Sequence, residues 1–235
     1  MKRDYNFIPI SFPLFLVLLA FAFLLLPVLL FLYTGGIVEA FSRLGFSPAT
    51  GFLIFILTLV GSAINIPMKK IKSKTPFVQD KIINFYGMSY RVPVVVSEDI
   101  LVALNVGGAL IPIIISLYEF LRMAATRHFA QILITIISVV IVSVFCHLFA
   151  KPVKGVGIAI PFFIPPLITV IVASLIARGN ASAVAYISGT LGTLIGADIS
   201  NLNKLDELGA PVASIGGAGT FDGIFLTGIL SVLLI

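Results

Sequence analysis

The sequence predicts an all-α polytopic membrane protein, and three observations support this fold class. Of the 235 residues, 59% are hydrophobic and 11% are charged, whereas a soluble domain of this length carries about 25% charged residues. Apolar runs of about 18 residues recur along the chain, long enough to cross the hydrocarbon core of a bilayer. The basic residues gather in a few of the connections between these runs. The lipid bilayer is therefore the expected partner of most of the chain.

About seven transmembrane helices are predicted, within a single integral membrane domain that covers residues 1–235. The first apolar run, Ser11 to Tyr33, is too long for the hydrophobic region of a signal peptide and lacks a small-residue cleavage site. We therefore interpret it as the first span. The predicted spans cover residues 11–34, 48–68, 100–121, 129–150, 156–177, 182–202 and 212–235.

The distribution of basic residues predicts the orientation. Eleven would lie on one side of the membrane, namely Lys2, Arg3, Lys69, Lys70, Lys72, Lys74, Lys81, Arg91, Lys151, Lys154 and Lys204. Four would lie on the other side, namely Arg43, Arg122, Arg127 and Arg178. The positive-inside rule then places the N-terminus in the cytoplasm and the C-terminus outside it.

The connection 69–99 is the one long connection, and we expect it to be a cytoplasmic insertion. Its β-branched and aromatic residues flank a turn signal at Gly87, which predicts a small cytoplasmic β-hairpin. Pro93 would confine the second strand to an edge. The basic run at its start has no interleaved aromatic residues, so it indicates contact with anionic headgroups and no binding of nucleic acid.

Two pairs of segments resemble each other and predict an internal repeat. Leu59–Lys70 resembles Leu194–Leu205, and Asn105–Ile113 resembles Ser214–Asp222. The order of the matches predicts two parallel three-helix pseudo-repeats, 11–121 and 156–235, joined by a linker helix at 129–150. Some small transporters have this arrangement.

Asp198 and Asp222 are the two acidic residues predicted to lie well inside spans. An aspartate at the centre of a span costs about 2.5 to 3.5 kcal/mol on translocon scales, so its presence indicates a function. The repeat alignment places both acids in the second copy only, opposite Ala63 and Ile113. A purely architectural role would have required them in both copies.

The last span is predicted to be broken near Asp222. Pro211 and four glycines up to Gly223 weaken a helix between residues 211 and 220. From Asp222 to Ile235 the chain reads as a half-helix about 21 Å long, which is shorter than the hydrocarbon core. The positive end of this half-helix would favour a charged carboxylate.

One function that fits these residues is an aspartyl hydrolase inside the membrane, with Asp198 and Asp222 as catalytic residues. Two nearby carboxyl groups share a proton, so that one activates water and the other protonates the scissile carbonyl group. The segment Gly219–Phe225, GTFDGIF, resembles the Gly-x-Gly-Asp segment of the presenilin and signal-peptide-peptidase superfamily of intramembrane proteases. The resemblance implies one catalytic aspartate on each of two consecutive spans. Phe221 replaces the second glycine of that motif, and Ala197 stands where the superfamily has a tyrosine.

A second function is a small secondary transporter or an ion- or proton-coupled permease, and a third is a non-catalytic membrane scaffold. In the transport alternative, polar residues of both repeats converge with the two acids near the membrane midplane. The substrate is then a small solute instead of a membrane peptide. The predicted substrate- or ion-binding residues are Asn65, Asn105, Thr193, Ser200, Asn201, Gly216, Gly217 and Gly219.

No cofactor or metal site is predicted. The two histidines, His128 and His147, fall near opposite ends of one predicted span, and Cys146 is the single cysteine. No phosphate-binding Gly-Lys-Ser/Thr loop and no Ser-His-Asp arrangement is present.

A wider resemblance covers nearly the whole chain. The strings GSAINIP, ALNVGGALIP, SGTLGTLIGAD and SIGGAGTFDGIFLTG are similar to an uncharacterised family of archaeal and bacterial multi-pass proteins, defined as a domain of unknown function. The resemblance implies a prokaryotic cytoplasmic membrane and supplies no activity.

Overall fold

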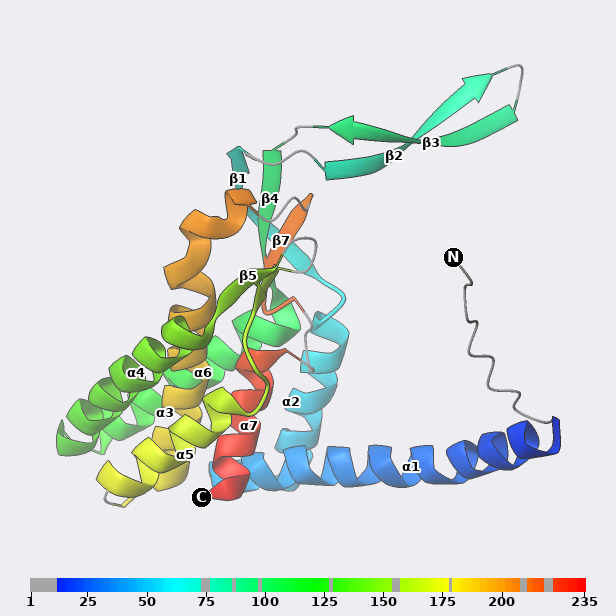
Figure 1. Ribbon diagram of the computed structural model, residues 1–235. Coiled ribbons are helices and arrows are strands. Elements are labelled where there is room, and N and C mark those ends of the chain that lie inside the picture. The colour runs from blue at the N-terminus through cyan, green and yellow to red at the C-terminus, as the bar shows by residue number, and fades with distance from the viewer. Residues whose placement is uncertain are drawn as a thin grey trace, which may run out of the picture.

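The protein folds as a helical bundle with a small β-sheet at one end (Figure 1). The computed structural model describes residues 12–72, 77–85, 88–96, 99–126, 129–153, 157–177, 179–207, 211–217 and 222–235. Within them the α-helices are α1 Phe12–Arg43, α2 Pro48–Gly61, α3 Ile111–Ala125, α4 Phe129–Phe149, α5 Ile164–Ile176, α6 Ala181–Thr193 and α7 Gly223–Leu234.

Two helices change geometry at the sheet end of the bundle. The π-helical turn η1 (Val106–Leu110) leads into α3, and a second π-helical turn, η2 (Leu194–Asp198), continues α6. The 3₁₀-helix η3 (Ile199–Glu207) follows η2 directly. Single π-helical turns occur frequently at functional sites, and η2 ends at one of the two predicted catalytic acids.

The helices indicate a membrane protein. Among the described residues, three helical stretches are long and apolar enough to cross a membrane: Val106–Ala125, Phe129–Phe149 and Ala181–Asp206. The helices α2, α5 and α7 are apolar but shorter. Large apolar side chains such as Leu133, Val140 and Leu148 of α4 are exposed, as expected for a surface that faces lipid. The count of seven spans and their orientation stay predictions.

A three-stranded sheet forms from segments far apart in the sequence. The strands β1 (Asn65–Lys72), β4 (Asp99–Asn105) and β7 (Val212–Ile215) lie in the order β1-β4-β7. β1 is antiparallel to β4, whereas β7 is parallel to β4 with Leu101 opposite Val212.

The prediction that spans 48–68 and 100–121 include these strand residues is therefore wrong. α2 ends at Gly61, and helical structure resumes only at Val106. β4 buries Val102, Ala103 and Asn105. Since a short strand covered on both faces is a continuous apolar run, its composition does not distinguish it from the start of a helix.

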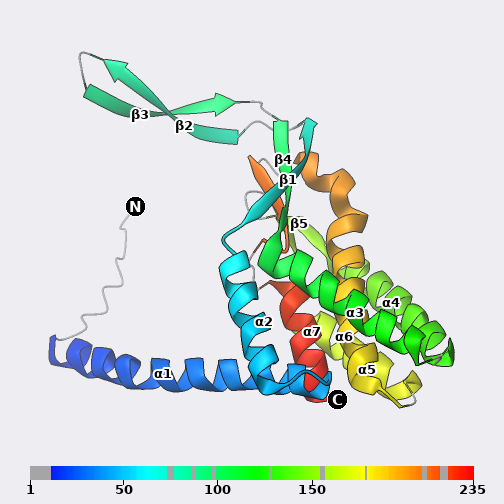
Figure 2. The ribbon, with the colours of Figure 1, turned by 180° about the vertical axis from the view of Figure 1, so that it is seen from behind.

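The predicted β-hairpin in the 69–99 connection is present. β2 (Phe77–Phe85) pairs antiparallel with β3 (Met88–Val96), and Pro93 lies opposite Asp80 in a two-stranded sheet where both strands are edges. Gly87 lies outside the described residues. The hairpin extends from the sheet end of the molecule, away from the helices (Figure 2).

A second, shorter hairpin connects α4 to α5. It consists of β5 (Lys151–Val153) and β6 (Gly157–Ala159), paired antiparallel. The helical part of the predicted span 156–177 therefore begins only at Ile164, where α5 starts with two prolines in its first turn. β6 lies close enough to the bundle to line the cavity described below.

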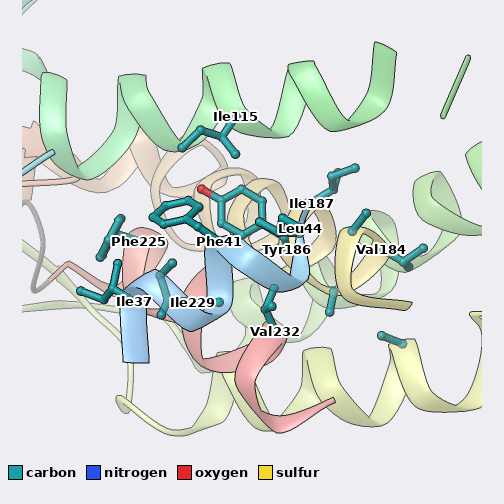
Figure 3. Packing of buried hydrophobic residues seen from close by; sticks show 14 of the residues in the cluster. Ile37, Phe41, Leu44, Ile115, Val184, Tyr186, Ile187, Phe225, Ile229 and Val232 are labelled. Atoms are coloured by element: carbon teal, nitrogen blue, oxygen red, sulfur yellow. The ribbon is translucent and has the colours of Figure 1, made fainter. Parts of the chain in front are cut away.

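The main hydrophobic core lies between α1, α3, α6 and α7 (Figure 3). The last part of α1 crosses the end of the bundle that is remote from the sheet (Figures 1 and 2). Its Phe41 packs against Tyr186 of α6, with ring centroids 6.4 Å apart. The core residues labelled in Figure 3 are Ile37, Phe41, Leu44, Ile115, Val184, Tyr186, Ile187, Phe225, Ile229 and Val232.

Residues 211–217 are not helical, as the glycines and Pro211 predicted. Residues 212–215 form β7, Gly216 has a φ of 69°, and α7 begins at Gly223. The predicted repeat stays a prediction. Strand is followed by helix in both copies, β4 before α3 and β7 before α7, but β1 is a strand where the matched residues 199–205 form the 3₁₀-helix η3.

Candidate functional site

Asp198 and Asp222 line the same cavity, which has a volume of about 230 Å³. The cavity lies at the sheet end of the bundle, between β6, β7, η3 and the start of α7. Residues from five elements or their ends therefore meet there. The lining residues are Gly157, Ile158, Asp198, Leu202, Leu205, Val212, Ala213, Ser214, Ile215, Gly217 and Asp222.

Asp198 is positioned by the change of helix type after α6. A π-turn followed by a 3₁₀-helix leaves backbone carbonyl groups without their usual partners, and polar side chains bind them. The amide of Asn201 donates to the carbonyl oxygens of Gly196 and Ala197, at 3.2 and 2.8 Å. The hydroxyl group of Ser200 donates to the carbonyl oxygen of Ile195 at 2.7 Å. These bonds hold Asp198 at the end of η2.

Asp222 is the N-cap of α7. Its Oδ2 atom accepts a hydrogen bond from the backbone N–H of Ile224 at 2.9 Å, and its backbone is extended, with φ −74° and ψ 150°. The positive end of the helix dipole stabilises a negative charge at this position. The prediction that Asp222 begins a half-helix agrees with this geometry.

The two carboxyl groups are within electrostatic reach of each other. The charge of Asp222 acts on Asp198, and the backbone N–H of Gly216 faces the Asp198 carboxyl group as a donor. Both side chains are partly buried. Two carboxyl groups that share a cavity and act on each other electrostatically are candidates for acid–base chemistry on water.

A hydrogen-bond network holds β7 in its place beside the cavity. The hydroxyl group of Ser214 donates to Oδ1 of Asn65 at 2.6 Å. The buried Asn105 donates from Nδ2 to Asn65 Oδ1 at 3.1 Å and to the Ser62 carbonyl oxygen at 2.8 Å. The Oδ1 atom of Asn105 accepts from the N–H of Gly108 at 2.8 Å and caps η1. Asn65 and Asn105 thus bind protein groups and do not line the cavity.

Glycine is required where the chain turns from β7 toward Asp222. At Gly216 a Cβ atom would lie 2.6 Å from the carbonyl carbon of Gly108, and the φ of 69° is unfavourable for other residues. Gly217 lines the cavity directly. Gly219, which was also predicted to contribute, lies outside the described residues.

The structure places the other predicted residues behind the cavity wall. Thr193 is buried, with its hydroxyl oxygen 3.8 Å from the sulfur of Cys146. Asn201 accepts from Lys204 at 2.7 Å and lies 3.4 Å from Nδ1 of His147. Within the described part of the chain, no three His, Cys, Asp or Glu side chains are grouped so that they could hold a metal ion.

Sequence reasoning missed Ser214 and the apolar wall of the cavity. Ile158, Leu202 and Leu205 come from β6 and η3, and Val212 comes from β7. The parallel pairing of β7 with β4 places Val212 and Ser214 at the cavity, whereas the other residues of this wall come from β6 and η3. The signal that could have indicated Ser214 is its place as a polar residue in an apolar run, beside the glycines before Asp222.

Comparison with known families matches residues 59–234, from the end of α2 to the end of α7, to a family model described as "Protein of unknown function (DUF1614)". The chain belongs to this family. The DUF1614 region contains the whole cavity and both aspartates, and the match confirms the predicted membership of an uncharacterised family. No curated protein and no solved structure matches the chain. No comparison supports the likeness of the DUF1614 chain to intramembrane proteases.

Proposed function

We propose that the protein is an aspartyl hydrolase embedded in the membrane, with Asp198 and Asp222 as its catalytic pair. The observation that carries this proposal is that the two acids, on η2 and at the start of α7, line one cavity and interact electrostatically. A cavity of about 230 Å³ has room for water beside a substrate group, because one water occupies about 30 Å³ of liquid volume.

The proposed reaction is the hydrolysis of an amide bond. One ionised aspartate removes a proton from water as the water oxygen forms a bond with the carbonyl carbon. The other aspartate gives its proton to the carbonyl oxygen, so that a neutral tetrahedral gem-diol forms. The C–N bond then breaks, a proton passes to the leaving nitrogen, and a carboxylic acid and an amine are released. Asp222, which a helix N-terminus stabilises in its charged form, is the proposed base.

The cavity wall favours an extended peptide as the substrate. β7 is the last strand in the order β1-β4-β7, so one of its edges has no strand partner within the described residues. Extended peptides bind such edges through main-chain hydrogen bonds. Ile158, Leu202 and Val212 line the same cavity and suit apolar side chains near the scissile bond.

We infer that the sheet end faces the cytoplasm of a prokaryotic cell. Lysines lie on β1, β5 and η3 at this end, whereas Arg43 contacts the last turn of α7 and Arg122 contacts Leu44 after α1, and these ends of α7 and α1 are remote from the sheet (Figure 1). This distribution is the one that the positive-inside rule requires. The lysines are Lys69, Lys70, Lys72, Lys151 and Lys204. A Lys70→Cys, Cys146→Ser variant should react with an impermeant thiol reagent only in opened cells; reaction in intact cells would reverse the orientation.

The test of the catalytic proposal uses the full chain in liposomes together with a mixture of membrane-spanning peptides. Mass spectrometry should detect cleavage, and in H₂¹⁸O one ¹⁸O atom should enter the new carboxyl group. Asp198→Asn and Asp222→Asn should each lower the rate by about 10²- to 10⁴-fold, the usual contribution of a general acid or base. Asp99→Asn is the matched control because Asp99 is exposed on β4 and lies outside the cavity lining.

Each outcome of this experiment is decisive. Cleavage that survives both substitutions would contradict the assignment of the catalytic pair. If no peptide is cleaved, but proton or solute flux through the liposomes is lost in both aspartate variants and kept in Asp99→Asn, the permease alternative replaces the hydrolase.

A further inference from the structure

A second buried acid lies in the bundle, away from the cavity that contains the two aspartates. Glu119 on α3 is fully buried, with 0% of its surface exposed. A buried carboxylate is costly unless it is paired and hydrogen-bonded. The groups around Glu119 therefore decide whether its carboxyl group is charged or neutral.

Arg122 is the charged partner of Glu119. Its Nη2 atom lies 2.8 Å from Oε2 of Glu119, and its Nη1 atom donates to the carbonyl oxygen of Leu44 at the end of α1. The two atoms of the ion pair are close but misaligned, because neither carboxylate oxygen has a hydrogen bond of good geometry. The pairing leaves part of the cost of burial uncompensated.

Three hydroxyl groups of the same bundle core are also buried without a hydrogen bond of good geometry among the described residues: those of Ser231 and of Tyr186 and Thr190, which face each other one helical turn apart on α6. The charge of Glu119 acts on the hydroxyl group of Tyr186. In Figure 3 the hydroxyl end of Tyr186 points toward the side on which Ile115 of α3 lies, one helical turn before Glu119. The hydroxyl oxygen of Tyr186 is thus the proposed acceptor for a hydrogen bond from the Glu119 carboxyl group.

Arg122 also borders open space. It is one-third exposed and lines a separate cavity of about 310 Å³ together with Met123, Thr126, Gln131 and Asn180. The side-chain oxygens of Thr126, Gln131 and Asn180 are groups to which a guanidinium group can donate. The guanidinium group of Arg122 can therefore bind either the Glu119 carboxylate or the polar groups that line this cavity.

We propose that Glu119 is a proton-binding site and that Arg122 is its movable counter-ion. A proton from hydronium in the external solution enters through the Arg122 cavity and adds to a Glu119 oxygen, leaving water, and the resulting neutral carboxyl O–H donates to the Tyr186 hydroxyl oxygen. Arg122 keeps its charge and turns from Glu119 to the polar side of the cavity. The site goes beyond the proposed hydrolase, because it shares no residue with the Asp198–Asp222 cavity.

Among the described residues, which exclude Arg127, His128 and Arg178, few other charged or titratable groups face this site. On α6 the only titratable side chain is Tyr186, and α2, α5 and α7 carry none within their helical bounds. On α4 the titratable residues, Cys146 and His147, lie near the end remote from the Arg122 cavity. On α1, Glu39 is paired with Arg43 at 3.1 Å. A proton bound near Arg122 is therefore assigned to Glu119.

The test is infrared difference spectroscopy of the full chain in liposomes while the pH is lowered. A carboxylic C=O band should appear in the unsubstituted protein and shift on ¹³C-glutamate labelling. Glu119→Gln should remove it, and the matched change Glu39→Gln should leave it unchanged, since Glu39 is exposed and paired elsewhere. Tyr186→Phe should move the band to the higher frequency of a carboxyl group with one hydrogen bond fewer.

Three results would overturn the proposal. If no band shifts on ¹³C-glutamate labelling, Glu119 stays ionised and the Glu119–Arg122 pair is structural only. The same conclusion follows if the labelled band survives Glu119→Gln. The ¹³C label also enters Glu39, Glu98 and Glu207. If Glu119→Gln fails to fold, the labelled band must therefore persist in a variant with glutamine at those three positions; its loss there would assign the band to another glutamate and overturn the proposal. An unchanged frequency in Tyr186→Phe would remove Tyr186 from the site.

Discussion

The carboxylate of Asp222 is bound to the helix that it begins: its Oδ2 atom accepts the N–H of Ile224 at 2.9 Å, while the same side chain lines the cavity that contains Asp198. One residue thus has a structural and a proposed chemical role. The two roles can be separated because asparagine caps helices about as well as aspartate.

Asp222→Asn should therefore keep the fold and lose the proposed activity. We expect a stability within about 0.5 kcal/mol of the unsubstituted protein, because the amide oxygen still accepts the Ile224 N–H. Asp222→Ala removes the cap and should cost about 1 kcal/mol. Thermal unfolding in detergent measures both. Equal destabilisation by Asn and Ala would show that the amide oxygen does not replace the carboxylate as the cap.

Asn105→Ala should destabilise the protein strongly. It should also loosen β7, the strand that lines the cavity. The substitution removes three hydrogen bonds of a fully buried side chain, to Ser62, Asn65 and Gly108. Leaving buried groups unsatisfied costs about 1 to 3 kcal/mol each, so we expect a loss of at least about 3 kcal/mol. The matched control is Asn203→Ala, because Asn203 is exposed on η3. Similar unfolding midpoints for the two variants would contradict the role of the network.

Several features of the fold follow from local sequence patterns. The apolar runs indicate membrane helices, the alternation around Gly87 predicts a hairpin, and the glycines before Asp222 predict a broken helix. The sheet could not be predicted in this way. β4 and β7 lie more than 100 positions apart, with Leu101 opposite Val212. No local pattern determines a parallel pairing over that distance.

The same limit applies to the site. Asp198 and Asp222 could be identified because a charge in an apolar run is costly and so indicates a function. Asn65, Asn105 and Asn201 are also polar residues in predicted spans, but they bind backbone and side-chain groups of the protein. A sequence shows that such a residue needs a partner and does not show whether that partner is a ligand or the protein itself.

Arg43→Gln should loosen the contact between α1 and α7. The guanidinium group donates to the carbonyl oxygens of Val232 and Leu233 at 3.3 and 3.2 Å, so it caps the C-terminal end of α7. A cation at this end of a helix contributes about 0.3 to 1 kcal/mol. Glu39→Gln, which breaks only the exposed pair with Arg43, should change the stability by less than about 0.5 kcal/mol. Faster hydrogen exchange at the end of α7 in Arg43→Gln alone would support this assignment.

Gly216→Ala adds only one methyl group, but it should lower both the stability and the proposed activity. A methyl group there lies 2.6 Å from the carbonyl carbon of Gly108, and the left-handed φ of 69° costs about 1 to 2 kcal/mol for a residue with a Cβ atom. Because the Gly216 N–H faces Asp198 and the neighbouring Gly217 lines the cavity, relief of the clash moves the chain beside the proposed catalytic pair. We expect a loss of about 2 kcal/mol in stability together with most of the hydrolytic rate.

Gly223→Ala is the matched control for Gly216→Ala. A methyl group at Gly223 meets nothing within 4 Å and lies in the first turn of α7, next to Asp222. Alanine there should keep or slightly raise the stability, by up to about 1 kcal/mol, because it favours a helix more than glycine does. Both substitutions add the same group to the two ends of the segment between β7 and α7, so equal effects on rate and stability would show that the backbone conformation at Gly216 is not required.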